Sequence, residues 1–120
     1  MMDATWAKTF AAEWIAAWNS HDLERILSHY TGDFEMSSPL IIDWGLDPSG
    51  TLRGKDKVRS YWGLGLSKLP DLHFELLGVF AGVNSIMLHY RGAKGRLGAE
   101  VLHFNTQGKV AKGFAHHLLT

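Results

Sequence analysis

Apolar residues recur at helical spacing near the start of the chain. Four aromatic residues lie four positions apart: Trp6, Phe10, Trp14 and Trp18. This period predicts an amphipathic helix over residues 4–19 with one buried face. Asp3 is expected to be its N-cap, and the helix is expected to end near Asn19 and Ser20, which are poor helix-interior residues.

Two further helices follow from the same kind of pattern. A second, short helix is predicted over residues 22–30, with Gly32 as its C-cap glycine. A third is predicted over residues 55–68, where Val58, Tyr61, Trp62 and Leu66 form an apolar stripe. Gly63 and Gly65 weaken this helix, each by about 1 kcal/mol relative to alanine.

In the remaining segments, apolar residues alternate with polar ones or form short continuous runs between turn residues, a pattern that is typical of β-strands. A short strand is predicted over residues 34–38, ended by Pro39, and residues 40–54 are predicted to be a loop in which Leu52 starts a brief strand. Four longer strands are predicted, with glycine or asparagine in their turns: residues 72–80, 85–91, 96–105 and 110–118. Helices first and a meander after them predict an α+β fold, with helices packed on a curved antiparallel sheet.

Composition narrows the class of protein. The chain has 120 residues, 46% of them hydrophobic, which suits a single domain over residues 1–120. Twelve basic and twelve acidic residues give a net charge of zero, so we expect no nucleic-acid partner. A neutral surface also suits a homodimer. The chain has no cysteine, no basic and apolar leader and no run long enough for a bilayer, so we expect a cytoplasmic protein with no membrane partner.

The order of motifs resembles a known group of folds. The sequence Asn19-Ser20-His21-Asp22-Leu23 joins the first two helices, Gly32-Asp33 precedes the first strand, and Pro39 follows it. With the strand at Val101-Leu102-His103-Phe104, this order resembles the NTF2-like superfamily, and within it the SnoaL-like polyketide cyclases and the ketosteroid isomerases. The resemblance implies a cone-shaped fold with an apolar pocket, a small hydrophobic ligand and dimerisation through the outer face of the sheet.

Strand alternation divides the side chains into two faces. If the resemblance holds throughout, the inner face and the helices supply the ligand contacts: Trp14, Met36, Ser38, Trp62, Leu88, Leu102 and Phe104. The outer face, where the dimer contact is expected, carries His89, His103, Phe114 and His116.

The catalytic residues of these relatives are replaced in this chain. The positions that hold the general-base aspartate, the donor tyrosine and the protonated aspartate of ketosteroid isomerases are Ser38, Trp14 and Leu102 here. The acid–base aspartate of the cyclases aligns near Ala115. Serine is a poor base without a partner and leucine cannot stabilise an oxyanion, so the usual isomerase mechanism is not expected.

Other residues on the inner face supply candidate chemistry. Glu100 facing an apolar pocket would have a raised pKa and could act as a general acid or base. The alternative is an exposed Glu100, or one paired with Arg96 or Lys94. His117 could act as a base or pair with Glu100. The alternative is that it lies in a frayed segment near the end of the chain and has no such role. Tyr90 could donate to a substrate oxygen, or it could serve in packing alone.

Weaker signals complete the set. Asp43 could enter the pocket from its loop as a base, although a solvated loop carboxylate is the commoner case. The histidines lack the spacing of metal ligands and no glycine-rich phosphate loop is present, so we expect no metal and no cofactor.

Two hypotheses remain: a cofactor-independent isomerase, cyclase or related acid–base enzyme on a small apolar carbonyl compound, or a non-catalytic ligand-binding or accessory module. A protein-binding domain is disfavoured because nothing marks a peptide-binding surface.

Overall fold

Residues 2–119, which the computed structural model describes, form helices and a six-stranded sheet in the α+β arrangement that the sequence predicts. In chain order the elements are α1 (Ala4–Ser20), α2 (Leu23–Leu27), β1 (Tyr30–Ser37), α3 (Pro39–Asp43), β2 (Thr51–Arg53), α4 (Lys55–Lys68), β3 (Glu75–Ala81), β4 (Ser85–Arg91), η1 (Ala93–Gly95), β5 (Leu97–Phe104) and β6 (Val110–His117).

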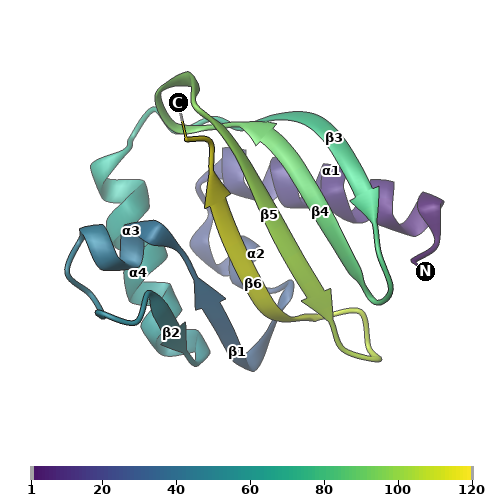
Figure 1. Cartoon of the computed structure of the whole chain (residues 1–120), viewed down its shortest axis with the longest axis horizontal. Coiled ribbons are helices and arrows are strands. Elements are labelled where there is room, and N and C mark those ends of the chain that lie inside the picture. Colours follow the sequence, from purple (N-terminus) through teal and green to yellow (C-terminus); the bar gives the residue numbers. More distant parts are fainter. Residues whose placement is uncertain (1, 120) are drawn as a thin grey trace.

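The sheet is mixed. Its strand order is β2-β1-β6-β5-β4-β3, in which β1 and β6 run parallel and all other neighbours run antiparallel. The predicted meander is therefore present in β3 to β6, and the N-terminal strand joins its end. Figure 1 shows α1 crossing behind the sheet, while α3 and α4 lie beside β1. The core fills the space between these helices and the inner face of the sheet.

Helix α1 follows its sequence pattern closely. The Asp3 carboxylate accepts a hydrogen bond of 2.8 Å from the Trp6 backbone N–H, as an N-cap does. The helix ends after Ser20 because His21 adopts a left-handed conformation with φ 59°. Its buried face carries Phe10, Trp14 and Trp18 against the sheet.

The prediction for the second helix was wrong at its end. Helix α2 ends at Leu27, Tyr30 begins strand β1, and Gly32 lies inside that strand instead of capping a helix. Tyr30 pairs with Val110 of β6, and its ring lies 4.6 Å from that of Phe34. These contacts come from distant parts of the chain, so local periodicity could not reveal them.

The segment 40–54 was predicted to be a loop but begins with helix α3. Ser38 is the N-cap, with its hydroxyl accepting from the Leu40 N–H at 3.2 Å, and Pro39 takes the first helical position. A serine followed by a proline commonly marks the start of a helix, whereas Pro39 was expected only to end the preceding strand. The brief strand expected at Leu52 is confirmed as β2.

Strand β3 begins at Glu75, three residues later than the 72 predicted, because α1 holds the preceding segment. The Asn19 side chain donates to the Phe74 carbonyl at 3.0 Å and accepts from the Phe74 N–H at 2.7 Å. The His21 Nε2 atom lies 2.7 Å from the Leu72 carbonyl oxygen. Side chains of the α1 terminus thus take the place of a neighbouring strand.

Glu13 links α1 to the α2 region, and this link predicts a pH-dependent stability. Its carboxylate accepts from Arg25 Nη2 at 2.8 Å and lies 3.0 Å from His29 Nε2. The Arg25 hydrogen bond, followed by that of His29, lowers the pKa of Glu13 from 4.5 to about 2. The charged form is therefore favoured by folding, and its contribution to stability is present above 4.5 and lost as the pH falls toward 2.

We expect Glu13→Gln to lower the Tm at neutral pH and to converge on the wild type in acid, measured by circular dichroism melting across pH. The control is Glu75→Gln, an exposed carboxylate that forms no ion pair within residues 2–119. A deficit that stays the same at every pH would contradict the ion-pair explanation.

Candidate functional site

A cavity of about 550 Å³ opens between α1, α4 and the inner face of the sheet. Its wall takes residues from most elements of the fold, so only the folded chain assembles it. The aromatic members are Trp14, Trp18, Trp44, Tyr61, Trp62, Phe74 and Tyr90. The ionisable members besides these tyrosines are Lys68, Lys94, Arg96, Glu100 and His117.

The aromatic side chains of the wall pack on one another. The Trp14 ring is stacked on Phe74 with centroids 5.5 Å apart, and the Trp18 ring meets Trp62 edge-on at 5.1 Å. The Trp14 indole N–H donates to the Tyr30 hydroxyl at 3.0 Å. This packing fixes the wall in place and leaves a largely apolar interior.

Glu100 is the buried carboxyl group of this interior. It lies on β5 and is only 8% exposed, and the Tyr90 hydroxyl donates to its Oε1 atom at 3.2 Å. Burial raises the pKa of Glu100 to about 7, while the Tyr90 hydrogen bond acts in the opposite direction. Within residues 2–119 no basic side chain forms an ion pair with Glu100, so the alternatives of exposure or pairing with Arg96 or Lys94 do not hold.

Gly98 makes the Tyr90 position possible. It lies directly opposite Tyr90 in the β4–β5 ladder. A Cβ atom at Gly98 would come within 3.1 Å of Tyr90 Cε1 and 3.1 Å of the His116 carbonyl oxygen. The glycine therefore gives the tyrosine ring room to lie against β5, with its hydroxyl reaching Glu100 two positions along the strand.

The Glu100 charge also affects the pKa of two further tyrosines, Tyr61 and Tyr30. Tyr61 donates to the Ser38 hydroxyl at 3.1 Å, and burial raises the pKa of Tyr61 to about 12. Burial, followed by the Glu100 charge, raises the pKa of Tyr30 and Tyr90 well above their usual range. All three phenols are consequently protonated, neutral hydrogen-bonding groups near pH 7.

His117 occupies a different part of the wall. It is the last residue of β6, it is exposed, and it lies opposite Gly98, whereas Ala115 lies opposite Glu100. No hydrogen bond joins His117 to Glu100 within the described residues, so the expected carboxylate–imidazole pair is not formed. Partial desolvation at the cavity wall, followed by the Arg96 charge, lowers the pKa of His117, which favours the neutral imidazole near pH 7.

The structure places four of the seven expected ligand contacts on the wall: Trp14, Met36, Ser38 and Trp62. Leu88 and Leu102 face the same side but are fully buried in the core behind the wall. Phe104 packs its ring 5.0 Å from Trp6 and 4.9 Å from Phe10. The first half of α1 thus covers that end of β5, so sharing a sheet face did not bring these three residues to the cavity.

Several wall residues were not among the expected contacts. Trp44 and Tyr61 lie on or beside helices whose inward faces the apolar pattern could have indicated. Lys68, Lys94 and Arg96 carried no such signal, because their positions at the cavity depend on loop and helix-end geometry. Asp43, considered as a loop base, is the exposed last residue of α3 and does not line the cavity.

Comparison with known proteins agrees with this architecture. A family model described as the SnoaL-like domain matches residues 11–113, and the chain therefore belongs to the SnoaL-like family. The chain is 52% identical to a SnoaL-like protein of unknown function from Burkholderia thailandensis, with a TM-score of 0.94 and 98% of each chain covered. The resemblance and the fold class expected from the sequence are thus confirmed.

More distant structures share the fold. The epoxide hydrolase/cyclase-like enzyme SalBIII, which has a role in pyran ring formation in the polyether salinomycin, is 17% identical with a TM-score of 0.79, covering 99% of this chain and 95% of SalBIII. An NTF2-like protein of unknown function from Cytophaga hutchinsonii is 14% identical with a TM-score of 0.70, covering 93% of this chain and 89% of its own.

No curated protein matches the chain. Within residues 2–119, no helix combines the length and apolar character needed to cross a bilayer.

The pairing of Tyr90 with Glu100 yields a direct prediction. We expect Glu100 to titrate near pH 7, and Tyr90→Phe to raise that pKa further, because the hydroxyl favours the charged carboxylate. The measurement is the pH dependence of the Glu side-chain ¹³C resonance, assigned with Glu100→Gln. Tyr61→Phe is the matched control, since its hydroxyl donates to Ser38 instead. An unchanged or lower pKa in Tyr90→Phe would contradict this view of the pair.

Proposed function

We propose that this SnoaL-like protein is a cofactor-independent acid–base enzyme that moves a proton on a small apolar carbonyl compound. The observation that carries the proposal is the buried Glu100 carboxyl group, which has a raised pKa and a phenol as its hydrogen-bond partner. A group that titrates near neutral pH can both accept and return a proton. The aromatic wall favours a flat apolar ring as the substrate body.

The proton transfer would use Glu100 as the base. Its carboxylate takes the hydrogen from the carbon next to the substrate carbonyl, and the C–H electron pair moves to form an enolate. Glu100 then returns the proton to the same or a conjugated carbon, so that no external reagent is consumed. The low polarity of the site strengthens any hydrogen bond made to the developing charge.

The tyrosines supply neutral donors for that charge. Tyr90 already donates to Glu100, and Tyr61 lies on the same wall with its hydroxyl on Ser38. Either phenol can turn to a substrate oxygen without losing a proton, because its pKa lies far above neutral pH. His117 is the second candidate for proton transfer, as a neutral imidazole on the wall.

The fold neighbours support chemistry of this class without specifying the reaction. SalBIII, described as an epoxide hydrolase/cyclase-like enzyme, has the same fold. A second function, a ligand-binding or accessory module, is favoured by Ser38, Trp14, Leu102 and Ala115 at the positions that are catalytic in the isomerases and cyclases. Both functions use the same cavity, but only the enzyme needs Glu100 as a base. The effect of replacing Glu100 on catalysis therefore distinguishes them.

The test is solvent deuterium exchange at the acidic carbon of 1-tetralone, a bicyclic ketone, followed by ¹H NMR. We expect catalysed exchange to rise as the pH increases through about 7, because the carboxylate form of Glu100 is the base. Glu100→Gln should lower the rate by about 10²-fold or more.

Asp33→Asn, which alters an exposed carboxylate that lies outside this cavity wall, should leave the rate unchanged. His117→Asn measures the share of the second candidate. Equal exchange rates in the wild type and Glu100→Gln would contradict the enzyme proposal and leave the ligand-binding module.

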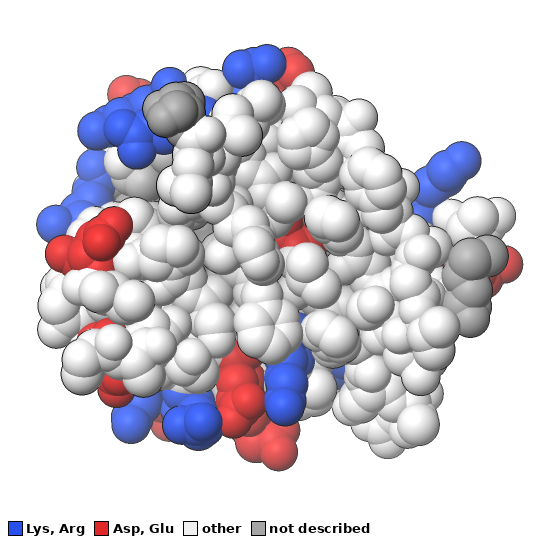
Figure 2. Space-filling model, viewed as in Figure 1, with Lys and Arg blue, Asp and Glu red and all other residues white. Residues whose placement is uncertain are grey.

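We also propose that two copies of the chain associate through the outer face of the sheet. Phe80, Met87, Val101 and Phe114 are aligned in register across β3 to β6. Phe80 is 55% exposed and Met87 37%. Figure 2 shows the face over these strands as mostly uncharged. An apolar row of this kind is typical of a protein interface.

Light scattering on the eluted protein tests the association. We expect the wild type to have twice the mass of the chain and Phe80→Glu to shift toward the monomer, because a charge would be buried at the interface. Leu64→Glu, at a 38% exposed position on α4, is the matched control and should stay dimeric. A monomeric wild type would overturn the proposal.

A further inference from the structure

The cavity is charged at its mouth and apolar within. Its exposed charged wall residues are Lys68 at the end of α4, Lys94 in η1 and Arg96 just before β5, all of them cationic. Its only carboxylate wall residue among those described is Glu100, which is buried. Exposure thus separates a positive rim from the interior, and the end of α4 and the β4–β5 connection contribute to that rim.

The rim cations are not neutralised by the protein. Within residues 2–119, Lys68, Lys94 and Arg96 form no ion pair with a carboxylate. The Lys68 ammonium lies 5.4 Å from the centroid of the Trp44 ring, and Trp44 also lines the cavity. This contact holds one cation beside the apolar wall while leaving its hydrogen-bond donors free for another group.

The backbone at Lys94 is held in an unusual conformation. Lys94 has φ 57° and ψ 27°, in the left-handed region that disfavours residues with a side chain by roughly 1–2 kcal/mol. Glycine would adopt this conformation without that cost, as the neighbouring Gly95 does at φ 74°. From this position Lys94 lines the wall of the cavity.

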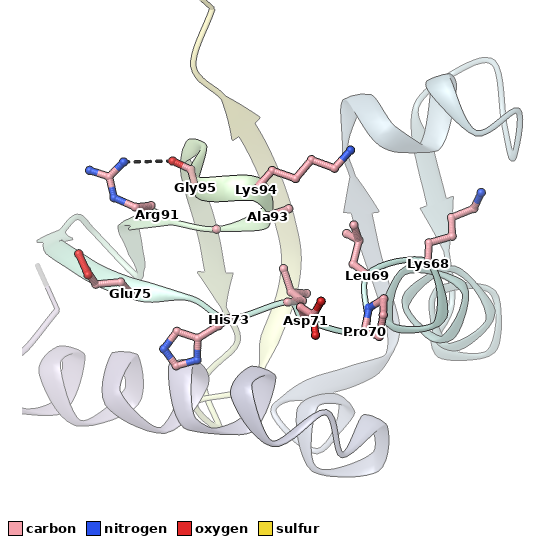
Figure 3. A pocket seen from close by; sticks show the side chains of 12 residues that line it. Lys68, Leu69, Pro70, Asp71, His73, Glu75, Arg91, Ala93, Lys94 and Gly95 are labelled. Atoms are coloured by element: carbon pink, nitrogen blue, oxygen red, sulfur yellow. Dashed lines mark hydrogen bonds between the residues drawn. The ribbon is translucent and has the colours of Figure 1, made fainter.

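A second hollow of about 530 Å³ continues outward from the rim (Figure 3). It shares six residues with the cavity wall: Lys68, Leu69, Leu72, Gly92, Ala93 and Lys94. In Figure 3 the Lys94 side chain points from the β4–β5 connection toward the end of α4, where Lys68 and Leu69 lie. Asp71 and Glu75 also line the hollow, and within residues 2–119 neither forms an ion pair with these lysines. A ligand group at the rim therefore has space beside the two ammonium groups.

We propose that the ligand of this cavity is an apolar ring compound that carries one anionic group, held at the mouth by Lys68, Lys94 and Arg96. The inference rests on the proposed function for the identity of the site, and it adds the class and orientation of the substrate. The ring enters the aromatic interior, and the reacting carbon lies toward Glu100. The cations attract the anion and fix its end of the molecule, so that the other end is presented to the base.

Binding of matched probes tests this inference in the Glu100→Gln protein, where catalysis does not interfere. The probes are 1-tetralone-6-carboxylate and its neutral methyl ester, with affinities measured by isothermal titration calorimetry. We expect the carboxylate to bind about tenfold more tightly than the ester at low salt, and the difference to shrink as salt is added. The phosphate ester of 6-hydroxy-1-tetralone, as a third probe, shows whether the rim prefers a carboxylate or a phosphate.

Charge-neutral variants identify the residues responsible. Combining Lys68→Gln with Lys94→Gln should remove most of the preference for the anionic probes while leaving the affinity for the methyl ester unchanged. Lys57→Gln, an exposed lysine earlier on α4 and outside both hollows, is the matched control and should preserve the preference. Equal affinity for the charged and neutral probes, or a preference that survives in the double variant, would overturn the inference.

The two proposals fail in distinguishable ways. Tight binding of the anionic probe without Glu100-dependent exchange would reject the enzyme and keep the rim assignment. Glu100-dependent exchange of 1-tetralone without a preference for the anionic probes would do the reverse.

Discussion

The organisation of this protein depends on keeping one carboxyl group out of water. Glu100 is buried on the inner face of β5, and this burial disfavours its charged form and raises its pKa to about 7, while the hydrogen bond from the Tyr90 hydroxyl acts in the opposite direction. That position requires neighbours that fit closely. Gly98 gives the Tyr90 ring its place, and the Trp14 and Phe74 rings pack against Tyr90 from the helix side. The burial of the Glu100 carboxyl group, the packing of the Tyr90 ring and the absence of a side chain at Gly98 thus depend on one another.

Helix α1 does more than cover the sheet. Trp14 joins the helix to β1 through its hydrogen bond to Tyr30, and Asn19 takes both backbone hydrogen bonds of Phe74 ahead of β3. The first half of the helix closes one end of the fold through contacts among Trp6, Phe10 and Phe104. Its second half leaves the other end open as the cavity. Helix α1 therefore closes one end of the fold and contributes Trp14 and Trp18 to the cavity wall at the other.

Three surfaces of the same sheet serve different physical purposes. The inner face carries the buried carboxyl group, and the outer face carries the apolar row that includes Phe80 and Phe114. The end near η1 carries cations that form no ion pair within residues 2–119. Figure 2 shows lysine and arginine atoms gathered over the end of α4 and the β4–β5 connection, apart from the uncharged face. Because the lysine and arginine charges stay at the solvent-exposed opening, the protein avoids the desolvation cost of burying them in the apolar interior.

Local periodicity in the sequence is enough to predict the elements that are formed by nearby residues. The four-residue spacing of Trp6 to Trp18 predicted α1 with its cap. Strand alternation determined which residues share a face with Glu100 and with Tyr90, and the resemblance to the ketosteroid isomerases assigned those faces to the pocket, from which a raised pKa of Glu100 followed. Tyr30 in β1, helix α3 and the late start of β3 could not be derived in this way, because contacts from distant segments decide them. The mouth of the cavity had the same origin, since Lys68, Lys94 and Arg96 show no periodic signal. Which inner-face residues reach the cavity depends on long-range packing: Trp6 and Phe10 of α1 pack on Phe104, Leu102 is buried in the core, and Glu100 remains on the cavity wall.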